Sequence, residues 1–134
     1  MERLAGHDVR FTAGRRAVFR LLSRADGPLS AGEIHRQLKT LPLSSIYRTL
    51  TVLEESEILS LHHTRGVTRY ELADWIAGHH HHVVCAECGS VADVMLSPSL
   101  EDALERVVAS ASQGVGFSHD GHSLEIEGRC SSCR

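Results

Sequence analysis

Four cysteines constrain the fold of this 134-residue sequence more than any other feature. They form two C-x-x-C pairs, Cys85/Cys88 and Cys130/Cys133, with 41 residues between the pairs. Two residues between the sulfurs allow a tight turn to direct both at one ion, and Gly89 follows the first pair, where such a turn often needs a positive φ. We therefore predict one four-cysteine structural zinc site that ties a strand end to the C-terminal segment. A thioredoxin-like redox pair is the alternative, but it needs only one such motif.

The composition is that of an ordinary globular protein, with 42% hydrophobic and 23% charged residues. No apolar run approaches the ~18 residues of a membrane span, so we expect no membrane association through a transmembrane helix. Residues 1–8 lack the hydrophobic core of a signal peptide, which predicts a cytoplasmic protein. Thiols stay reduced in that compartment, which favours metal binding over disulfides.

Charge is distributed unevenly along the chain. Residues 1–70 contain eleven Lys/Arg and seven Asp/Glu, whereas residues 71–134 contain three Lys/Arg and ten Asp/Glu. This asymmetry predicts that the basic first half binds a polyanion and that the acidic second half binds cations. The alternative is that both halves carry ordinary solvated charges.

The first half has the start and stop signals of three helices followed by a β-hairpin. Thr12 is a cap for a helix that ends before Asp26-Gly27-Pro28, and Ser30 and Glu33 form a capping box. Ser44 or Ser45 is expected to cap a third helix that buries Ile46, Leu50 and Leu53, and residues 58–62 and 68–72 alternate as a hairpin around a turn at 64–66. This order predicts a winged helix-turn-helix.

In such a domain the third helix enters the major groove of DNA. Tyr47 and Arg48 are expected in its first turn, and other basic residues supply contacts to phosphates. The alternative is a small helical domain that binds protein and packs Tyr47 in its core, but the basic balance favours DNA. The predicted DNA-binding residues are Arg10, Arg15, Ser45, Tyr47, Arg48 and Thr49.

Histidines are concentrated in the second half and at the junction. Eight of the ten lie between positions 62 and 122, and four are consecutive at 79–82. The run is internal, unlike an expression tag, and leads into Val83-Val84-Cys85, so we expect extended backbone. Side chains alternate faces along a strand, which places His79 and His81 on one side and His80 and His82 on the other. The run therefore predicts ligand pairs for two different ions.

Further ligands are expected from neighbouring elements. Ser97-Pro98 begins a helix that carries Glu101 in its first turn, and His122 opens a predicted strand over 122–128. Four more candidates lie near the junction of the two halves: His62, His63, Glu71 and Asp74. Each of these taken singly is more often a solvated surface residue, but the nearby histidine run favours metal binding.

Four motifs occur in the order and spacing of a known family. Ser45–Leu50, Tyr70-Glu71-Leu72, the histidine run into Val84–Gly89, and Gly128–Cys133 resemble the ferric uptake regulator family over nearly the whole chain. The resemblance implies a homodimeric, metal-activated transcriptional repressor of α+β fold. A winged-helix domain over 1–72 would bind an AT-rich inverted repeat in double-stranded DNA. Residues 73–82 would form a hinge and ligand segment, and an α/β domain over 83–134 would dimerise and bind zinc.

The resemblance also implies three metal sites. Cys85, Cys88, Cys130 and Cys133 match the structural zinc ligands, and a dimerisation-domain site falls on His79, His81, Glu101 and His122. A hinge sensing site falls on His80, His82, Glu71 and one further residue, for which His62 is the first choice before His63 and Asp74. The chain departs from the family in having Pro28-Leu29 where iron-type members often have a histidine, and in lacking the cysteine near Trp75 and the aspartate near Leu59 of actinobacterial zinc-type members.

The sensed ion is expected to be Zn²⁺ or Fe²⁺. Zinc is slightly favoured because the histidine run is uninterrupted and all four ligands of the dimerisation-domain site are imidazoles or carboxylates. Glu71 and the missing cysteine instead favour iron. Peroxide sensing by an iron-bound member is a further alternative. A zinc hydrolase or deaminase is a remote one: Val83-Val84 stands where hydrolases of the H-x-H-x-D-H type need Asp-His, and no deaminase motif is present.

Overall fold

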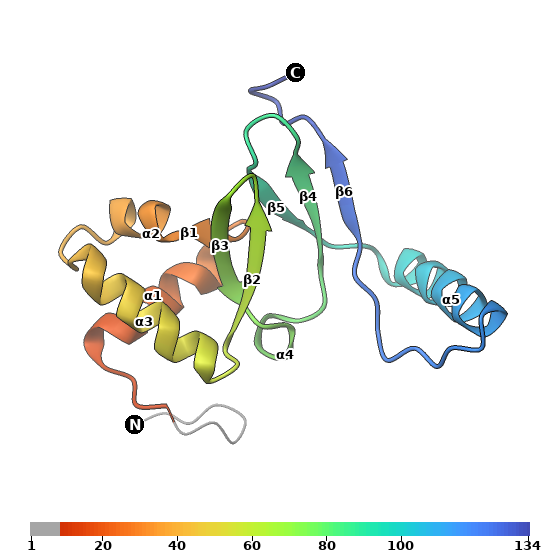
Figure 1. Cartoon of the computed structure of the whole chain (residues 1–134), viewed down its shortest axis with the longest axis horizontal. Coiled ribbons are helices and arrows are strands. Elements are labelled where there is room, and N and C mark those ends of the chain that lie inside the picture. Colours follow the sequence, from red (N-terminus) through yellow and green to blue (C-terminus); the bar gives the residue numbers. More distant parts are fainter. Residues whose placement is uncertain (1–8) are drawn as a thin grey trace. The chain divides into compact units, whose positions relative to one another are not determined.

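A computed structural model describes residues 9–134, and the chain divides into two units, Met1–His79 and His80–Arg134. Residues 1–8, on which the expectation of no signal peptide rests, lie outside this described part. No helix within residues 9–134 is long and apolar enough to cross a membrane. Figure 1 follows the elements in chain order, and each unit is described by itself below.

The first unit is a winged helix-turn-helix, as predicted. Its three longer helices gather beside a small antiparallel sheet of strand order β1-β3-β2 (Figure 1). The elements are α1 (Ala13–Arg24), β1 (Leu29–Ser30), α2 (Ala31–Gln37), α3 (Leu43–Glu55), β2 (Leu59–Thr64), β3 (Val67–Leu72) and α4 (Asp74–Ala77).

Two of the three helix caps predicted for the first unit are confirmed. The Thr12 hydroxyl accepts a hydrogen bond from the backbone N–H of Arg15 at 3.3 Å. At the start of α2, the Ser30 hydroxyl accepts from the Glu33 N–H at 3.1 Å, and the Glu33 carboxylate accepts from the Ser30 N–H at 3.0 Å. These bonds satisfy donors that the first helical turn leaves without an intrahelical partner.

The third predicted cap is wrong, because α3 begins at Leu43, before Ser44 and Ser45. Pro42 is the N-cap residue, and its carbonyl accepts from the N–H groups of Ser45 and Ile46 at 3.0 and 3.1 Å. The fixed φ of proline suits the entry to a helix without a side-chain cap. Tyr47 therefore lies in the second turn of the helix, not in the first.

The core of the first unit and its hairpin turn follow directly from the sequence pattern. The core includes side chains with no exposed surface from α1, α2, α3 and the start of the hairpin: Val18, Ile34, Ile46, Leu53 and Ile58. Strands β2 and β3 pair from Thr64 opposite Val67, which leaves Arg65 and Gly66 as a two-residue loop with φ of 50° and 74°. Positive φ at both positions is typical of the type I′ turn, for which glycine is suited.

The second unit is a small α/β domain, also as predicted. Strand β4 is central in the order β5-β4-β6, antiparallel to β5 and parallel to β6. The predicted strand over 122–128 is too long, because ladder pairing with β4 starts only opposite His82, and His122 lies in the irregular segment before it. The elements are β4 (His81–Cys85), β5 (Val91–Val94), α5 (Pro98–Gly114) and β6 (Glu125–Gly128).

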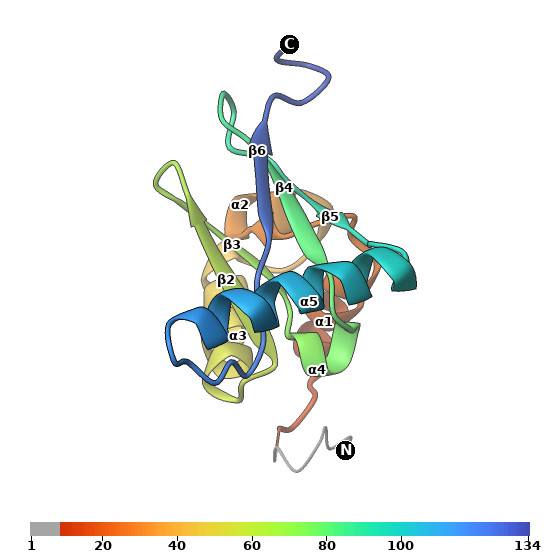
Figure 2. The same ribbon diagram turned by 90° about the vertical axis from the view of Figure 1, so that its right-hand side faces the viewer.

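Helix α5 leaves part of its apolar side exposed. Ser97 caps it as predicted, accepting from the Leu100 N–H at 3.3 Å, with Pro98 at the first position. Figure 2 shows the helix crossing the direction of β4 and β6, and none of its residues is buried. The second unit therefore exposes large apolar side chains on the helix and in the segments next to it: Met95, Leu100, Val107, Val115 and Phe117. Ile126 on β6 is exposed as well.

We predict that Leu50→Ala destabilises the first unit by about 2–5 kcal/mol, because it empties a site with 1% exposure in a packed core. Urea unfolding followed by the fluorescence of Trp75, the single tryptophan, measures this change. Leu43→Ala is the matched control on the same helix, since Leu43 is 41% exposed. Equal losses from the two substitutions would contradict the described core.

Candidate metal centres

The four cysteines meet at one end of the second unit. Strand β4 ends at Cys85, and its parallel register places Gly128 of β6 opposite this residue. The turn after β4 carries Cys88, and the segment after β6 carries Cys130 and Cys133. All four sulfurs lie within 4.8 Å of one another, although the two pairs are far apart in sequence.

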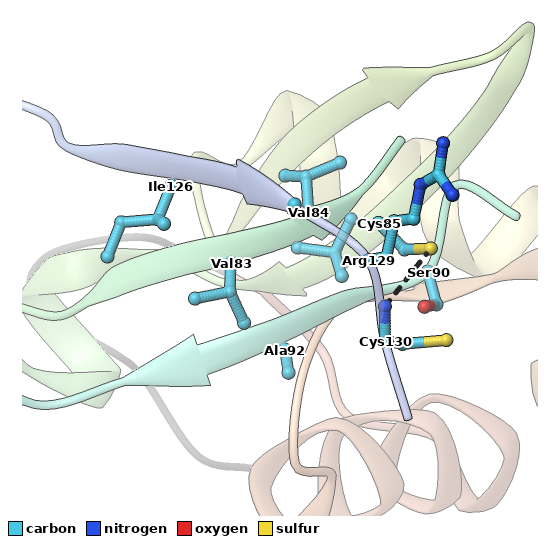
Figure 3. Close-up of a pocket in the computed structure, with 10 residues that line it drawn as sticks. Val83, Val84, Cys85, Ser90, Ala92, Ile126, Arg129 and Cys130 are labelled. Atoms are coloured by element: carbon cyan, nitrogen blue, oxygen red, sulfur yellow. Dashed lines mark hydrogen bonds between the residues drawn. The ribbon is translucent and has the colours of Figure 1, made fainter. Parts of the chain in front are cut away.

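Backbone N–H groups prepare this cluster for a cation. The N–H groups of Cys88 and Cys130 each lie 3.4 Å from the Cys85 sulfur. Figure 3 shows the contact from Cys130. Together with the Glu87 backbone, these N–H groups lower the pKa of the Cys85 thiol to about 6. Hydrogen bonds with the Cys130 and Cys85 thiols instead raise the pKa of Cys133 to about 12. Hydrogen bonds with Ser90 also lower the pKa of the Cys88 thiol, so the cluster favours the thiolate form of Cys85 and Cys88 and disfavours that of Cys133. Four thiolates in a closed set fit tetrahedral zinc.

The same end of the sheet bears an apolar hollow of about 420 Å³. Figure 3 shows Val83, Ala92 and Ile126 lining it, with Cys85 and Cys130 at one end.

The turn after the first cysteine pair has the backbone conformation that the sequence predicts. Gly89, which follows Cys88, has a positive φ of 78°.

A second group of ligand-type residues surrounds a carboxylate of α5. The Nε2 atoms of His81 and His122 each lie 2.9 Å from an oxygen of Glu101, and the two imidazole rings stack with centroids 5.3 Å apart. His81 is 1% exposed, so its imidazole is held almost out of water. His79, the fourth predicted member, precedes the second unit by one residue and is exposed. The helix, the strand and the irregular segment before β6 thus bring three predicted ligands together.

A third group lies along β4 and β5. The Nε2 atoms of His80 and His82 lie 3.5 and 3.4 Å from the same oxygen of Asp93, and their ring centroids are 4.9 Å apart. His81, between them in sequence, instead contacts Glu101. Successive imidazoles therefore meet different carboxylates, which is the alternation predicted for extended backbone.

The sequence reasoning missed Asp93. In the antiparallel register of β4 and β5, Asp93 pairs directly with His82, so the two side chains share a face. The signal that could have found it is the short Cys85–Ser90 connection, because a connection of this length makes β4 and β5 a hairpin and limits the registers in which they can pair.

The predicted ligands of the first unit lie on its hairpin. Glu71 is 6% exposed and its carboxylate lies 2.7 Å from Nε2 of His62 on the neighbouring strand. His63 pairs with Thr68 across the ladder and contacts its hydroxyl at 3.0 Å. Asp74 is the first residue of α4. His62 and Glu71 are thus brought together within this unit, and His63 contacts a different partner.

The predicted DNA-binding residues differ in their exposure. Tyr47 is 52% exposed, and Arg48 beside it is exposed as well, so both are available to a partner. A guanidinium nitrogen of Arg15 donates to the Arg10 carbonyl at 2.9 Å, which holds these two arginines together, and Ser45 is half-buried. Thr49 is only 9% exposed, so little of its side chain is accessible, and its role in DNA binding stays a prediction.

A winged helix-turn-helix joined to an α/β domain rich in metal ligands defines the class of metal-responsive DNA-binding regulators. The family model described as "Ferric uptake regulator family" matches residues 6–127, and this chain belongs to that family. Its members are metal-dependent regulators of transcription and not enzymes, so the hydrolase and deaminase alternatives are excluded.

Relatives named for different metals are similar to this chain. The zinc uptake regulation protein of Mycobacterium tuberculosis is 35% identical over 131 residues, covering 94% of this chain and 95% of that protein. The ferric uptake regulation protein of Bacillus subtilis is 32% identical over 139 residues, covering 98% and 90%. Among solved structures, the Helicobacter pylori ferric uptake regulator superposes with a TM-score of 0.67 at 26% identity, covering 93% of this chain and 82% of that one.

We predict that Cys130→Ser abolishes retention of zinc. Metal binding contributes directly to the folding free energy of such a site, so the variant is also expected to unfold at a lower temperature. Elemental analysis after gel filtration in mild chelator should find about one zinc per chain in the unmodified protein. Ser132→Ala, in the same turn, is the control and should retain zinc. Unchanged zinc content in Cys130→Ser would contradict the four-cysteine site.

Proposed function

We propose that this protein is a homodimeric repressor that binds DNA when a divalent metal occupies its labile sites, and that zinc is the ion it senses. The observation that carries the proposal is the separation of the histidine run into two ligand groups, one with Glu101 and one with Asp93. A cluster of imidazoles and carboxylates of this composition suits a first-row divalent ion.

The sensing site is proposed to consist of His80, His82, Asp93 and Glu71. The first three lie together in the second unit. Glu71 is proposed as the ligand from the first unit because it is a buried carboxylate on the last strand before the hinge, only nine positions before His80 in sequence. His62, bonded to Glu71, is proposed to orient this carboxylate rather than to bind metal itself.

The second labile site is proposed to consist of His81, Glu101, His122 and His79. His79 stands two positions before His81, and neighbours at that spacing share a face of extended backbone. The four-cysteine cluster is proposed as the structural zinc site. The Helicobacter pylori regulator, to which this chain is similar, is described as having three functional metal-binding sites, which supports three sites here.

Metal dependence is proposed to arise because the ligands of this sensing site come from both units. When His80, His82 and Glu71 hold one ion, the hinge residues 73–79 lose freedom, and the fraction of dimers with correctly spaced recognition helices rises. Coupling of this kind between two sites is typically about 1–3 kcal/mol, or 5- to 150-fold in affinity. The two α3 helices of a dimer then match two half-sites of an AT-rich inverted repeat, through exposed residues that include Tyr47 and Arg48.

Iron is the second candidate for the sensed ion, and Asp93 is the observation that favours it. The three proposed ligands from the second unit, His80, His82 and Asp93, are two histidines and one carboxylate, a set typical of non-haem Fe(II) sites with open positions. This arrangement also supports the peroxide-sensing alternative. The relative at 35% identity is a zinc regulator and one at 32% is a ferric regulator, so titration must distinguish the two ions.

We expect the affinity for an AT-rich palindromic DNA duplex to fall about 5- to 150-fold when the labile metal is removed. The zinc of the four-cysteine site is retained in this experiment. A gel-shift titration with Zn²⁺, with Fe²⁺ under anaerobic conditions, and with chelator measures this effect. Asp93→Asn should raise the metal concentration required for half-maximal binding. Asp120→Asn is the matched control, because Asp120 is exposed.

Equal DNA affinity in chelator and in metal would contradict the switch. Activation by Fe²⁺ but not by Zn²⁺ would replace zinc by iron as the sensed ion. Arg48→Ala should weaken binding in both conditions, because its proposed role is contact with DNA and not with metal.

A second copy of this chain is proposed to cover the exposed apolar side of the second unit. Val107 on α5 is 64% exposed and Phe117 after it is 67% exposed, and such side chains are unfavourable in water unless a partner buries them. We predict that Val107→Asp converts the dimer to a monomer in light scattering coupled to gel filtration. Arg106→Asp, at the adjacent position, is the control for the added negative charge. A dimeric Val107→Asp protein would contradict this interface.

A further inference from the structure

Helix α5 carries a second carboxylate one turn after Glu101. Residues four apart lie on the same face of a helix, so Glu105 follows Glu101 along the side that meets the histidines. One oxygen of Glu105 lies 3.3 Å from Nδ1 of His122, and the other is hydrogen bonded to Nε2 of His119. Neither Glu105 nor His119 belongs to a predicted metal-ligand set.

His122 needs such support because its backbone is irregular. It lies between α5 and β6, in a segment that no strand ladder fixes, three positions before Glu125. Its imidazole is held by side chains: it stacks on His81, meets Glu101 through Nε2 and meets Glu105 through Nδ1. The two ring nitrogens thus face two carboxylates on successive turns of one helix.

The geometry points to Glu105 as a positioning residue of the second labile metal site, with His119 holding Glu105 in place; this inference rests on the proposed function of that site. A histidine ligand binds metal through one neutral nitrogen and carries its proton on the other. Glu105 accepts a hydrogen bond from the N–H at Nδ1 of His122, and Nε2 of His122 is then left to bind the ion beside Glu101.

Charge supports the same assignment. Three imidazoles and the Glu101 carboxylate leave a divalent ion with a net charge of +1, and the Glu105 carboxylate brings the site to neutrality without entering the coordination sphere. The His119 contact ties the segment to α5 at a second point, three positions before His122. Glu105 therefore fixes both the tautomer of the ligand and the segment that carries it.

The test is a Co²⁺ titration of the full chain in a His80→Ala, His82→Ala background, with the zinc of the four-cysteine site retained, so that the second site is the labile one. A competing chelator reports affinity, and the visible absorption bands of Co²⁺ report ligand geometry. We expect Glu105→Ala to weaken Co²⁺ binding about 10- to 100-fold and to shift the bands. Glu105→Gln, which keeps an oxygen acceptor but no charge, should be intermediate, and His119→Ala should show a smaller loss.

Asp102→Asn is the matched control, since Asp102 is an exposed carboxylate on the same helix. Binding and spectra of Glu105→Ala that equal those of the background protein, or an equal loss in Asp102→Asn, would overturn the positioning role. Circular dichroism of each variant separates loss of fold from loss of ligand orientation. If Glu105→Ala unfolds, the Co²⁺ affinity and spectrum of Glu105→Gln are compared with those of the background protein instead. If His122→Ala does not reduce the Co²⁺ binding of the background protein, the second labile site is absent. The proposed site and the positioning role of Glu105 then both fail.

Discussion

Strand β4 imposes the constraint on which the chemistry of the second unit depends. Consecutive side chains on a strand leave opposite faces, so adjacent histidines cannot serve one ion together. Pairing with β5 places Asp93 on the face of His82, while His81 on the other face is 1% exposed and meets Glu101 of α5. A one-residue slip of this ladder would exchange the two faces and dismantle both groups.

The cysteine cluster lies at the end of β4 opposite to the histidines and joins this strand to β6. Cys85 closes β4, Cys130 follows β6, and backbone N–H groups of both pairs converge on the Cys85 sulfur. A bound cation there would hold β6 against β4, and with it the segment that carries His122. A cation among the sulfurs and the proposed labile sites would then be connected through one sheet. The parallel register that places Cys85 opposite Gly128 also places His82 opposite Glu125, where the irregular segment that carries His122 ends.

Much of this organisation could be predicted from the sequence, since it depends on local patterns. Capping residues, the glycine-containing turn at Gly66 and the period-two alternation of 79–82 are all short-range signals. Asp93 is not evident from capping or alternation, because its position beside His82 depends on strand register, which only the shortness of the hairpin connection restricts. The start of α3 differs from the prediction because Pro42 opens the helix without a side-chain cap. The burial of Thr49 next to the exposed Arg48 follows from the helical period, which the motif alone does not reveal.

The most direct test of this account is a crystal structure of the zinc-loaded protein with an anomalous difference map recorded at the zinc absorption edge. The account predicts separate peaks on the two faces of β4, one beside His80, His82 and Asp93 and one beside His81, Glu101 and His122, in addition to a peak among the cysteine sulfurs. A single ion shared by neighbouring histidines, or imidazoles of the run with no ion beside them, would contradict it.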